Sequence, residues 1–238
     1  MTDIPKRLEH DSIIDAIIEI RFETDLNPNV VFAEIYSNIK EKFGGQVQSL
    51  PISQMPPDLI RQDPNLKNKP LYRINGDDCS LQIGSQMIAL SSKMPYIGWE
   101  KFSEMFSWIL SQCYDHVSAV TRLGLRYINF FEGDISDRVN IEFKLMDGYE
   151  MSKLNIQTEV ITEEFANTIQ YSPNAIKQTE NGTEQGSAID IDTFKMFNQA
   201  PCSLSDLLDD VNKAHQHEKE VFFSLLKPEL IEQMCPEY

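Results

Sequence analysis

The sequence predicts an α+β fold, an antiparallel sheet or sheets with helices packed on one face. Three observations support this prediction. Runs of alternating apolar residues occur throughout the chain, two long segments carry an apolar residue at every third or fourth position, and Asn, Asp and Gly residues separate several of the alternating runs. Short strands joined by tight turns favour an antiparallel sheet, and an amphipathic helix packs its apolar side against such a sheet.

The first strand is predicted over residues 12–23, SIIDAIIEIRFE. Its alternation gives one apolar face, made by Ile14, Ala16, Ile18, Ile20 and Phe22. A helix is predicted over residues 27–45, because Pro28 suits a first turn and the Gly44-Gly45 pair ends the pattern. Its apolar stripe consists of Val31, Ile35, Ile39 and Phe43.

An antiparallel meander is predicted next. QVQSLPIS is a candidate strand, a proline-rich connection follows it, and the runs LYRIN, CSLQIG and MIALSS are separated by turn residues. The segment GWEKFSEMFSWILSQCYDH then predicts a second helix. Its continuous stripe is Trp99, Phe102, Phe106, Ile109, Leu110 and Cys113.

A long strand is predicted from Val117 to Phe131, which contains TRLGLRYINFFE. Residues 135–146 fit either a strand or a helix, and we favour the strand. Three further strands are predicted in KLNIQTEVITEE, ANTIQYSP and SAIDIDTFKMF, with KQTENGTEQGS as a polar hairpin loop between the last two. The final helix is predicted to be capped by Ser203 or Ser205 and to end before Pro228.

This order predicts one compact body over residues 1–238, and it also fits two similar halves, 1–116 and 117–238. Aligning AIIEIRF with TRLGLRYINF places Arg21 over Arg126 and Phe22 over Tyr127. Each half then reads as a strand, a helical or ambiguous segment, a meander and a helix. Two strands that acquired the same pattern independently would give the same alignment.

The net charge of −16 is concentrated in the second half of the chain. Residues 1–131 hold 13 Lys and Arg against 16 Asp and Glu, whereas residues 132–238 hold 8 against 21. Such a field repels a phosphate backbone, so nucleic acid is not an expected ligand. An acidic half serves solubility in the first place, and a cationic protein partner or self-association is the more specific interpretation.

The cysteines and the hydropathy indicate a reduced, cytoplasmic protein. The four cysteines are widely spaced without a C-x-x-C pair, which predicts buried free thiols and no metal cofactor: Cys79, Cys113, Cys202 and Cys235. No stretch reaches the roughly 18 apolar residues of a membrane span. The opening MTDIPKRLEHDS also lacks the apolar core of a signal peptide.

Three segments resemble a known family: IIDAIIEIRFE near the start, GWEKF at the second helix and LGLRYIN at mid-chain. The family is a sporadically distributed, uncharacterised group of bacterial and archaeal proteins similar in length to this chain. Its pattern often has a proline just before the first strand, where this chain has His10-Asp11-Ser12. The resemblance implies a prokaryotic source and no particular activity.

Catalytic motifs are scarce. The sequence contains no G-x-x-x-x-G-K-[ST], G-x-G-x-x-G, G-x-S-x-G or H-E-x-x-H. The segment DISDRVNIEFK offers Asp134, Glu142 and Lys144, because on a strand Glu142 and Lys144 share a face. Carboxylates that hold Mg²⁺ beside a lysine are typical of a metal-dependent nuclease or phosphodiesterase. A solvated strand face explains the same residues.

Binding residues are predicted on the long strands. Arg126, Arg122 and Arg21 are candidates to clamp a carboxylate or phosphate, with internal ion pairs as the simpler interpretation. Gly124, between two of these arginines, removes side-chain cover and lets another group approach. Asn129, on an apolar face, is expected to satisfy a neighbouring backbone group.

Two further groups of polar residues complete the candidate sites. Asp190 and Asp192 share one strand face, which suits either a hard cation or the wet side of a strand. His215 and His217 lie about 200° apart around a helix, so they cannot share a ligand. His215 and Glu218 do share a face and are predicted to form a hydrogen-bonded polar pair at the edge of the apolar stripe.

The sequence favours a non-enzymatic binding or interaction module without a cofactor. The alternatives are the metal-dependent nuclease and an acidic decoy that mimics nucleic acid and occupies a basic protein. A protein partner or self-association is expected, a small ligand is an option, and a membrane is not.

Overall fold

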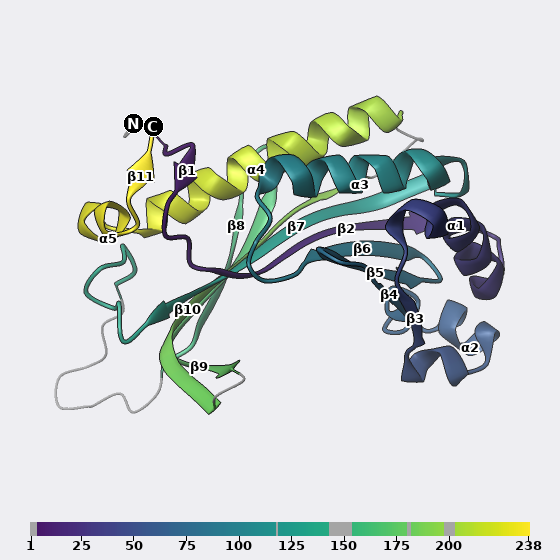
Figure 1. Ribbon diagram of the computed structural model, residues 1–238, viewed down its shortest axis with the longest axis horizontal. Helices are drawn as coiled ribbons and strands as arrows, with labels where there is room; N and C mark the ends of the chain where they lie inside the picture. The colour runs from purple at the N-terminus through teal and green to yellow at the C-terminus, as the bar shows by residue number, and fades with distance from the viewer. Residues whose placement is uncertain (1–3, 118, 143–153, 180–181, 198–202) are drawn as a thin grey trace. The chain divides into compact units, whose positions relative to one another are not determined.

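A computed structural model describes residues 4–117, 119–142, 154–179, 182–197 and 203–238 (Figure 1). The chain folds as two compact units. Unit 1 comprises residues 1–14, 126–193 and 214–238, and unit 2 comprises residues 15–125 and 194–213. These boundaries differ from the division at residue 116 that the sequence suggested, because the long strand at mid-chain and the final helix each contribute residues to both units.

Unit 2 contains the predicted meander. Its strands are β2 (Ile13–Glu23), β3 (Gln46–Ser49), β4 (Pro70–Asn75), β5 (Cys79–Gly84), β6 (Met87–Ser92) and the first part of β7 (Ala119–Glu132). They lie in the order β3-β4-β5-β6-β2-β7. The pairs β3·β4, β4·β5, β5·β6 and β2·β6 are antiparallel, with Ile18 opposite Leu90 and Ile74 opposite Leu81. The predicted antiparallel α+β class is therefore confirmed.

Two helices cover one face of the unit 2 strands, as predicted (Figure 1). Helix α1 (Pro28–Phe43) begins after Asn27, whose side chain accepts a hydrogen bond from the backbone N–H of Asn29 at 3.0 Å. Helix α3 (Trp99–Cys113) packs beside it. The predicted stripe of α1 is buried, and that of α3 is buried except for Trp99, which is partly exposed. The buried residues are Val31, Ile35, Ile39 and Phe43 from α1, and Phe102, Phe106, Ile109, Leu110 and Cys113 from α3.

The proline-rich connection contains more structure than the sequence indicated. A short 3-10 helix spans Pro51–Gln54, and helix α2 spans Pro57–Gln62. Each begins with a proline, which has no N–H to lose at a first helical position. Ile60 is the buried residue that anchors α2.

Unit 1 contains the remainder of β7, the strands β8 (Ile156–Ile161) and β9 (Ala166–Thr179), and all but the end of β10 (Gly182–Met196), in the order β7-β10-β9-β8. Helix α4 (Leu204–Leu225) supplies its second half to this unit. Helix α5 (Pro228–Gln233) and a two-stranded sheet of β1 (Arg7–Leu8) with β11 (Pro236–Glu237) complete it. The buried core of the unit is Phe131, Ile135, Val139, Tyr171, Ile189, Ile191, Phe222, Leu226, Leu230 and Met234.

Two predictions for this region were wrong. The segment KQTENGTEQGS is mostly strand, since β9 continues to Thr179 and β10 begins at Gly182; an ion pair of 2.7 Å between Lys177 Nζ and Glu184 Oε2 crosses the hairpin. The favoured strand over 135–146 is not present in its described part. Within 135–142, Val139 makes a single bridge to Leu226, and residues 143–146 lie outside the described residues.

Ser203, one of the two serines predicted to cap the final helix, caps α4. Ser203 Oγ accepts a hydrogen bond from the backbone N–H of Asp206 at 3.1 Å, and Asp206 Oδ2 accepts one from Ser203 Oγ at 2.7 Å. The sequence did not predict α5, β1 or β11. None of the described helices has the length and apolar character of a membrane span.

Candidate functional site

Arg126 is paired within unit 1. Its Nε donates to Asp190 Oδ1 at 2.8 Å and its Nη2 donates to Asp190 Oδ2 at 2.6 Å. This bidentate pairing matches the planar guanidinium to both carboxylate oxygens. Arg126, predicted to clamp the carboxylate of a ligand, therefore binds a carboxylate of the protein itself. Asp190, considered as a ligand for a cation, directs both of its carboxylate oxygens to Arg126.

Arg122 and Arg21 share an acid in unit 2. Arg122 Nη1 donates to Glu19 Oε1 at 2.9 Å, and Arg21 Nε donates to the same oxygen at 2.8 Å. The guanidinium of Arg122 lies directly over Gly124, where an added Cβ would collide with it. The bare backbone at Gly124 therefore admits the protein's own arginine.

Asn129 makes a side-chain contact rather than the expected backbone one. Its Oδ1 accepts a hydrogen bond from Ser12 Oγ at 3.0 Å, and the backbone N–H of Phe130 donates to Ser12 O at 2.8 Å. The two contacts attach the N-terminal segment to β7 in unit 1. Asn129 has a structural role at this position.

The predicted nuclease residues are not assembled by the described structure. Asp134 is exposed and accepts hydrogen bonds from the backbone N–H and the hydroxyl of Ser136, which hold the pKa of its carboxyl below the usual value. Glu142 is exposed and lies outside any strand. Lys144 lies outside the described residues. The shared strand face that motivated the proposal is absent at Glu142.

His215, on helix α4, lies against Tyr127 of β7 in unit 1. The Tyr127 hydroxyl and His215 Nδ1 are 3.5 Å apart, and the two rings are 6.0 Å apart between centroids. Burial lowers the pKa of His215 to about 3, because desolvation disfavours the imidazolium. His215 is therefore neutral near pH 7.

Glu218, one turn further along α4, is almost fully buried. Its Oε1 has no hydrogen-bond partner, and burial raises the pKa of the carboxyl to about 8, partly offset by the charge of Lys219. The sequence predicted a hydrogen-bonded pair of His215 and Glu218. Glu218 is instead a buried acid with one oxygen that accepts no hydrogen bond.

A polar network lies nearby on the sheet of unit 1. Thr193 Oγ1 donates to Asn167 Oδ1 at 2.7 Å, and Asn167 Nδ2 lies 3.0 Å from His217 Nε2. The His217 ring stacks on Phe165 at 5.4 Å between centroids. The sequence did not predict this network, although Asn167 and Thr193 both fall at alternating buried positions of β9 and β10.

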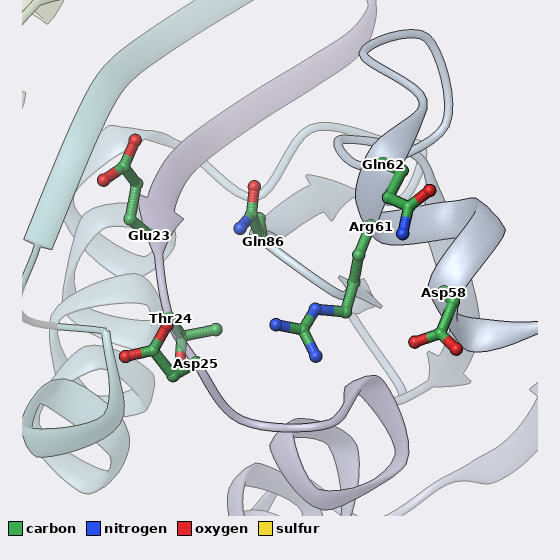
Figure 2. Close-up of a pocket in the computed structure, with 7 residues that line it drawn as sticks. All are labelled: Glu23, Thr24, Asp25, Asp58, Arg61, Gln62 and Gln86. Carbon is green, nitrogen blue, oxygen red and sulfur yellow. The ribbon is translucent and has the colours of Figure 1, made fainter.

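Unit 2 contains a polar cleft of about 390 Å³ that the sequence did not predict. It is lined by Glu23, Thr24, Asp25, Asp58, Arg61, Gln62 and Gln86. Figure 2 shows the Arg61 guanidinium pointing into the space between the segment after β2 and the carboxylate of Asp58. A cleft with one cation and three carboxylates fits a small polar ligand carrying both charges.

Among the described strands of unit 1, β8 lies at an edge. It is the terminal strand in the order β7-β10-β9-β8 and pairs with β9 from Ile156 opposite Tyr171 to Ile161 opposite Ala166. All its residues after Ile156 are exposed, and the exposed fractions of Val160 and Ile161 are 44% and 74%. Residues 154–176 hold three glutamates and no lysine or arginine.

Neither a protein-family model nor a curated protein matches this chain.

Proposed function

We propose that this protein is a non-enzymatic interaction module that binds an extended, cationic segment of a partner protein along strand β8. The observation that carries the proposal is the exposed apolar edge at Val160 and Ile161. Folded proteins usually protect such an edge with lysine, proline or a covering element, because its backbone groups are ready to pair with another chain. Binding partners use such edges by adding a strand.

The charge of the same region specifies the kind of partner. Glu159 lies on β8, and Glu163 and Glu164 follow it in the turn to β9. A segment with lysine or arginine at alternate positions would place apolar residues on Val160 or Ile161 and cations near these carboxylates. A second copy of this acidic chain is the less favourable occupant, since like charges oppose its approach.

Two further assignments belong to this proposal. The first is membership of the uncharacterised prokaryotic family that the sequence resembles, which has no established activity. The second is a reduced, cytoplasmic location, supported by the free, buried thiols of Cys79 and Cys113.

A fluorescent eight-residue peptide of alternating lysine and valine tests the proposal. Binding is measured by fluorescence anisotropy with the wild-type chain and with the double variant Val160→Lys, Ile161→Lys. We expect the affinity of the variant for the peptide to be lower by about tenfold or more, because lysines on an edge strand oppose the addition of another strand. Leu59→Lys, which adds a cation at an exposed apolar position of unit 2, is the matched control and should bind normally.

Two results would contradict this function. One is equal affinity of the wild type and the double variant for the peptide. The other is equal binding of a peptide in which glutamate replaces lysine, since that would remove the role of charge. Light scattering on the wild type distinguishes a second copy as the occupant, because a dimer lost in the double variant would place self-association at this edge.

A further inference from the structure

The two ends of the chain meet in unit 1. The backbone N–H of Lys6 donates to Glu237 O at 2.7 Å, that of Glu9 donates to Cys235 O at 3.2 Å, and that of His10 donates to Met234 O at 3.2 Å. These bonds extend the short pairing of β1 with β11. They hold Glu9 and His10 next to Cys235 through the backbone, independently of any side-chain contact.

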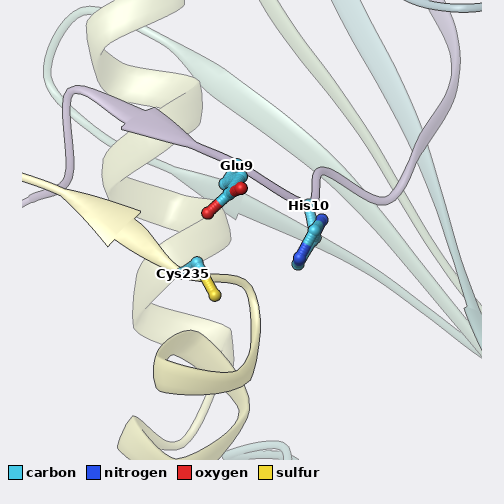
Figure 3. A group of neighbouring side chains, drawn as sticks. All are labelled: Glu9, His10 and Cys235. Atoms are coloured by element: carbon cyan, nitrogen blue, oxygen red, sulfur yellow. The ribbon is translucent and has the colours of Figure 1, made fainter.

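The side chains of these three residues gather at one point of the surface. A carboxylate oxygen of Glu9, a ring nitrogen of His10 and Sγ of Cys235 all lie within 4.8 Å of one another (Figure 3). All three residues are exposed, so an ion in solution has direct access. Within the described chain, no other group of three His, Cys, Asp or Glu side chains meets this spacing.

Cys235 differs from the other described cysteines. Burial raises the pKa of Cys79 to about 11 and that of Cys113 to about 12, which keeps both as inert thiols. Cys235 is exposed, and its φ of 51° places a non-glycine residue in the left-handed region. Such a conformation is uncommon and concentrates at functional positions. Its backbone N–H is fixed by a bond of 3.2 Å to Glu232 O.

We propose that Glu9, His10 and Cys235 form a Zn²⁺ site that joins the two ends of the chain. Thiolate, imidazole and carboxylate are the ligands of protein zinc, whereas Mg²⁺ and Ca²⁺ take oxygen alone. A tetrahedral zinc ion requires its ligand atoms roughly 3.3–3.6 Å apart, so the exposed side chains need to close by no more than about 1.5 Å. The fourth position is left for water or an external ligand.

A cleft of about 380 Å³ borders this site. Its lining includes His10 and Met234, the residue before Cys235, together with Arg138 and the apolar side chains Phe130, Phe131, Ile135 and Leu230. The cleft gives solvent access beside one of the three ligands. Three protein ligands with an open position are the arrangement of a zinc ion that exchanges its fourth ligand.

Binding is coupled to the protonation of Cys235. The zinc–sulfur bond forms as the thiol releases one proton to solvent. Because the metal contacts both ends of the folded chain, it also stabilises the native state over the unfolded one.

Titration of the full chain with Co²⁺, a spectroscopic substitute for Zn²⁺, tests the site. We expect an absorption band from thiolate-to-cobalt charge transfer that Zn²⁺ abolishes by competition. Cys235→Ser should remove the band, and His10→Gln should weaken Co²⁺ binding about tenfold or more, since each deletes one ligand. Cys202→Ser and His116→Gln make the same changes elsewhere and should leave the band and the affinity unchanged.

Two results would overturn the proposal. One is the absence of the charge-transfer band in the wild type at saturating Co²⁺. The other is wild-type affinity in His10→Gln, which changes an exposed side chain and leaves the backbone pairing of the chain ends in place. Circular dichroism of each variant establishes that the fold is retained. Zn²⁺ should raise the melting temperature of the wild type and of the two control variants, and less or not at all that of Cys235→Ser and His10→Gln.

Discussion

Helix α3 in unit 2 and the second half of α4 in unit 1 have apolar stripes of the same spacing but bury different chemistry. The residues of α3 that face the core are Phe102, Phe106, Ile109, Leu110 and Cys113. On α4, Ala214 and Phe222 flank Glu218, which is buried, and His215, which is partly buried. One helix excludes water with apolar groups, and the other takes ionisable groups into the same kind of environment.

The difference shows where the two units obtain their stability. Burial of apolar surface is favourable at any pH, so the contribution of α3 is constant. Burial of Glu218 is tolerated only while the carboxyl holds its proton, so the contribution of α4 depends on pH. Variants that act on one helix and not the other separate these two sources.

Phe106→Ala should give the largest effect. Phe106 is fully buried in unit 2, and loss of its ring removes apolar contacts and leaves a cavity. We expect the free energy of unfolding to fall by about 3–5 kcal/mol, measured by chemical denaturation. Leu59→Ala, at a half-exposed position of the same unit, is the control. A loss for Phe106→Ala no larger than that of the control would contradict the packing of α3.

Glu218→Gln should change the pH dependence of stability. The pKa of Glu218 is raised from 4.5 to about 8 in the folded protein, so between these values the native state binds a proton that the unfolded state has released. The wild type therefore loses stability as pH rises through this window, by up to about 1.4 kcal/mol per pH unit. Glutamine has no proton to lose and removes this slope.

We accordingly expect the unfolding free energy of Glu218→Gln, relative to that of the wild type, to increase by about 1–3 kcal/mol between pH 5 and pH 8. The contribution of His215 cancels in this difference, because both proteins carry it. Glu220→Gln, an exposed change on the same helix, should keep the wild-type slope. Parallel pH profiles for the wild type and Glu218→Gln would show that Glu218 is ionised in the fold.

The smallest effects are expected from alanine at two glycines in neighbouring strands. A Cβ at Gly186 in unit 1 meets the backbone carbonyl of Phe131 and the ring of Phe130, which cannot move freely. A Cβ at Gly124 in unit 2 meets the guanidinium of Arg122, the end of a flexible side chain. We expect Gly186→Ala to cost about 1–3 kcal/mol and Gly124→Ala less than about 1 kcal/mol, measured by thermal unfolding. A larger loss of stability for Gly124→Ala than for Gly186→Ala would mean that displacing Arg122 from Glu19 costs more than displacing the backbone of β7 at Phe131.

Local patterns predicted much of the fold. The alternation in β2 and the stripes of α1 and α3 were sufficient because each depends on residues a few positions apart, and the observed elements begin and end close to the expected residues. The strand favoured for 135–146 was wrong in the described part of that region, because apolar residues that satisfy both periods do not distinguish a strand from a helix. The hairpin of β9 and β10 was underestimated, because its polar composition resembles a loop while its backbone is paired.

The candidate sites were harder to predict than the strands. The sequence indicated that the arginines would find internal acids, but it did not identify Asp190 as the partner of Arg126. It singled out Glu218 without showing that the carboxyl would lack a partner. The sequence did not indicate the network of Asn167 and Thr193, because a lone polar residue in a strand is common in any sequence. It did not indicate the polar cleft around Arg61 either, because a short helix between prolines is equally common.

The sequence by itself determined the α+β class, the principal helices and meander strands, and the acidic character of the second half. These follow from periodicity and charge, which are properties of neighbouring residues and of composition. Only the tertiary structure decided which carboxylate meets which guanidinium, which acid is buried, which strand is left at an edge, and that Cys235 meets Glu9 and His10 from the opposite end of the chain. Such meetings depend on long-range chain closure, and no local pattern of residues records them.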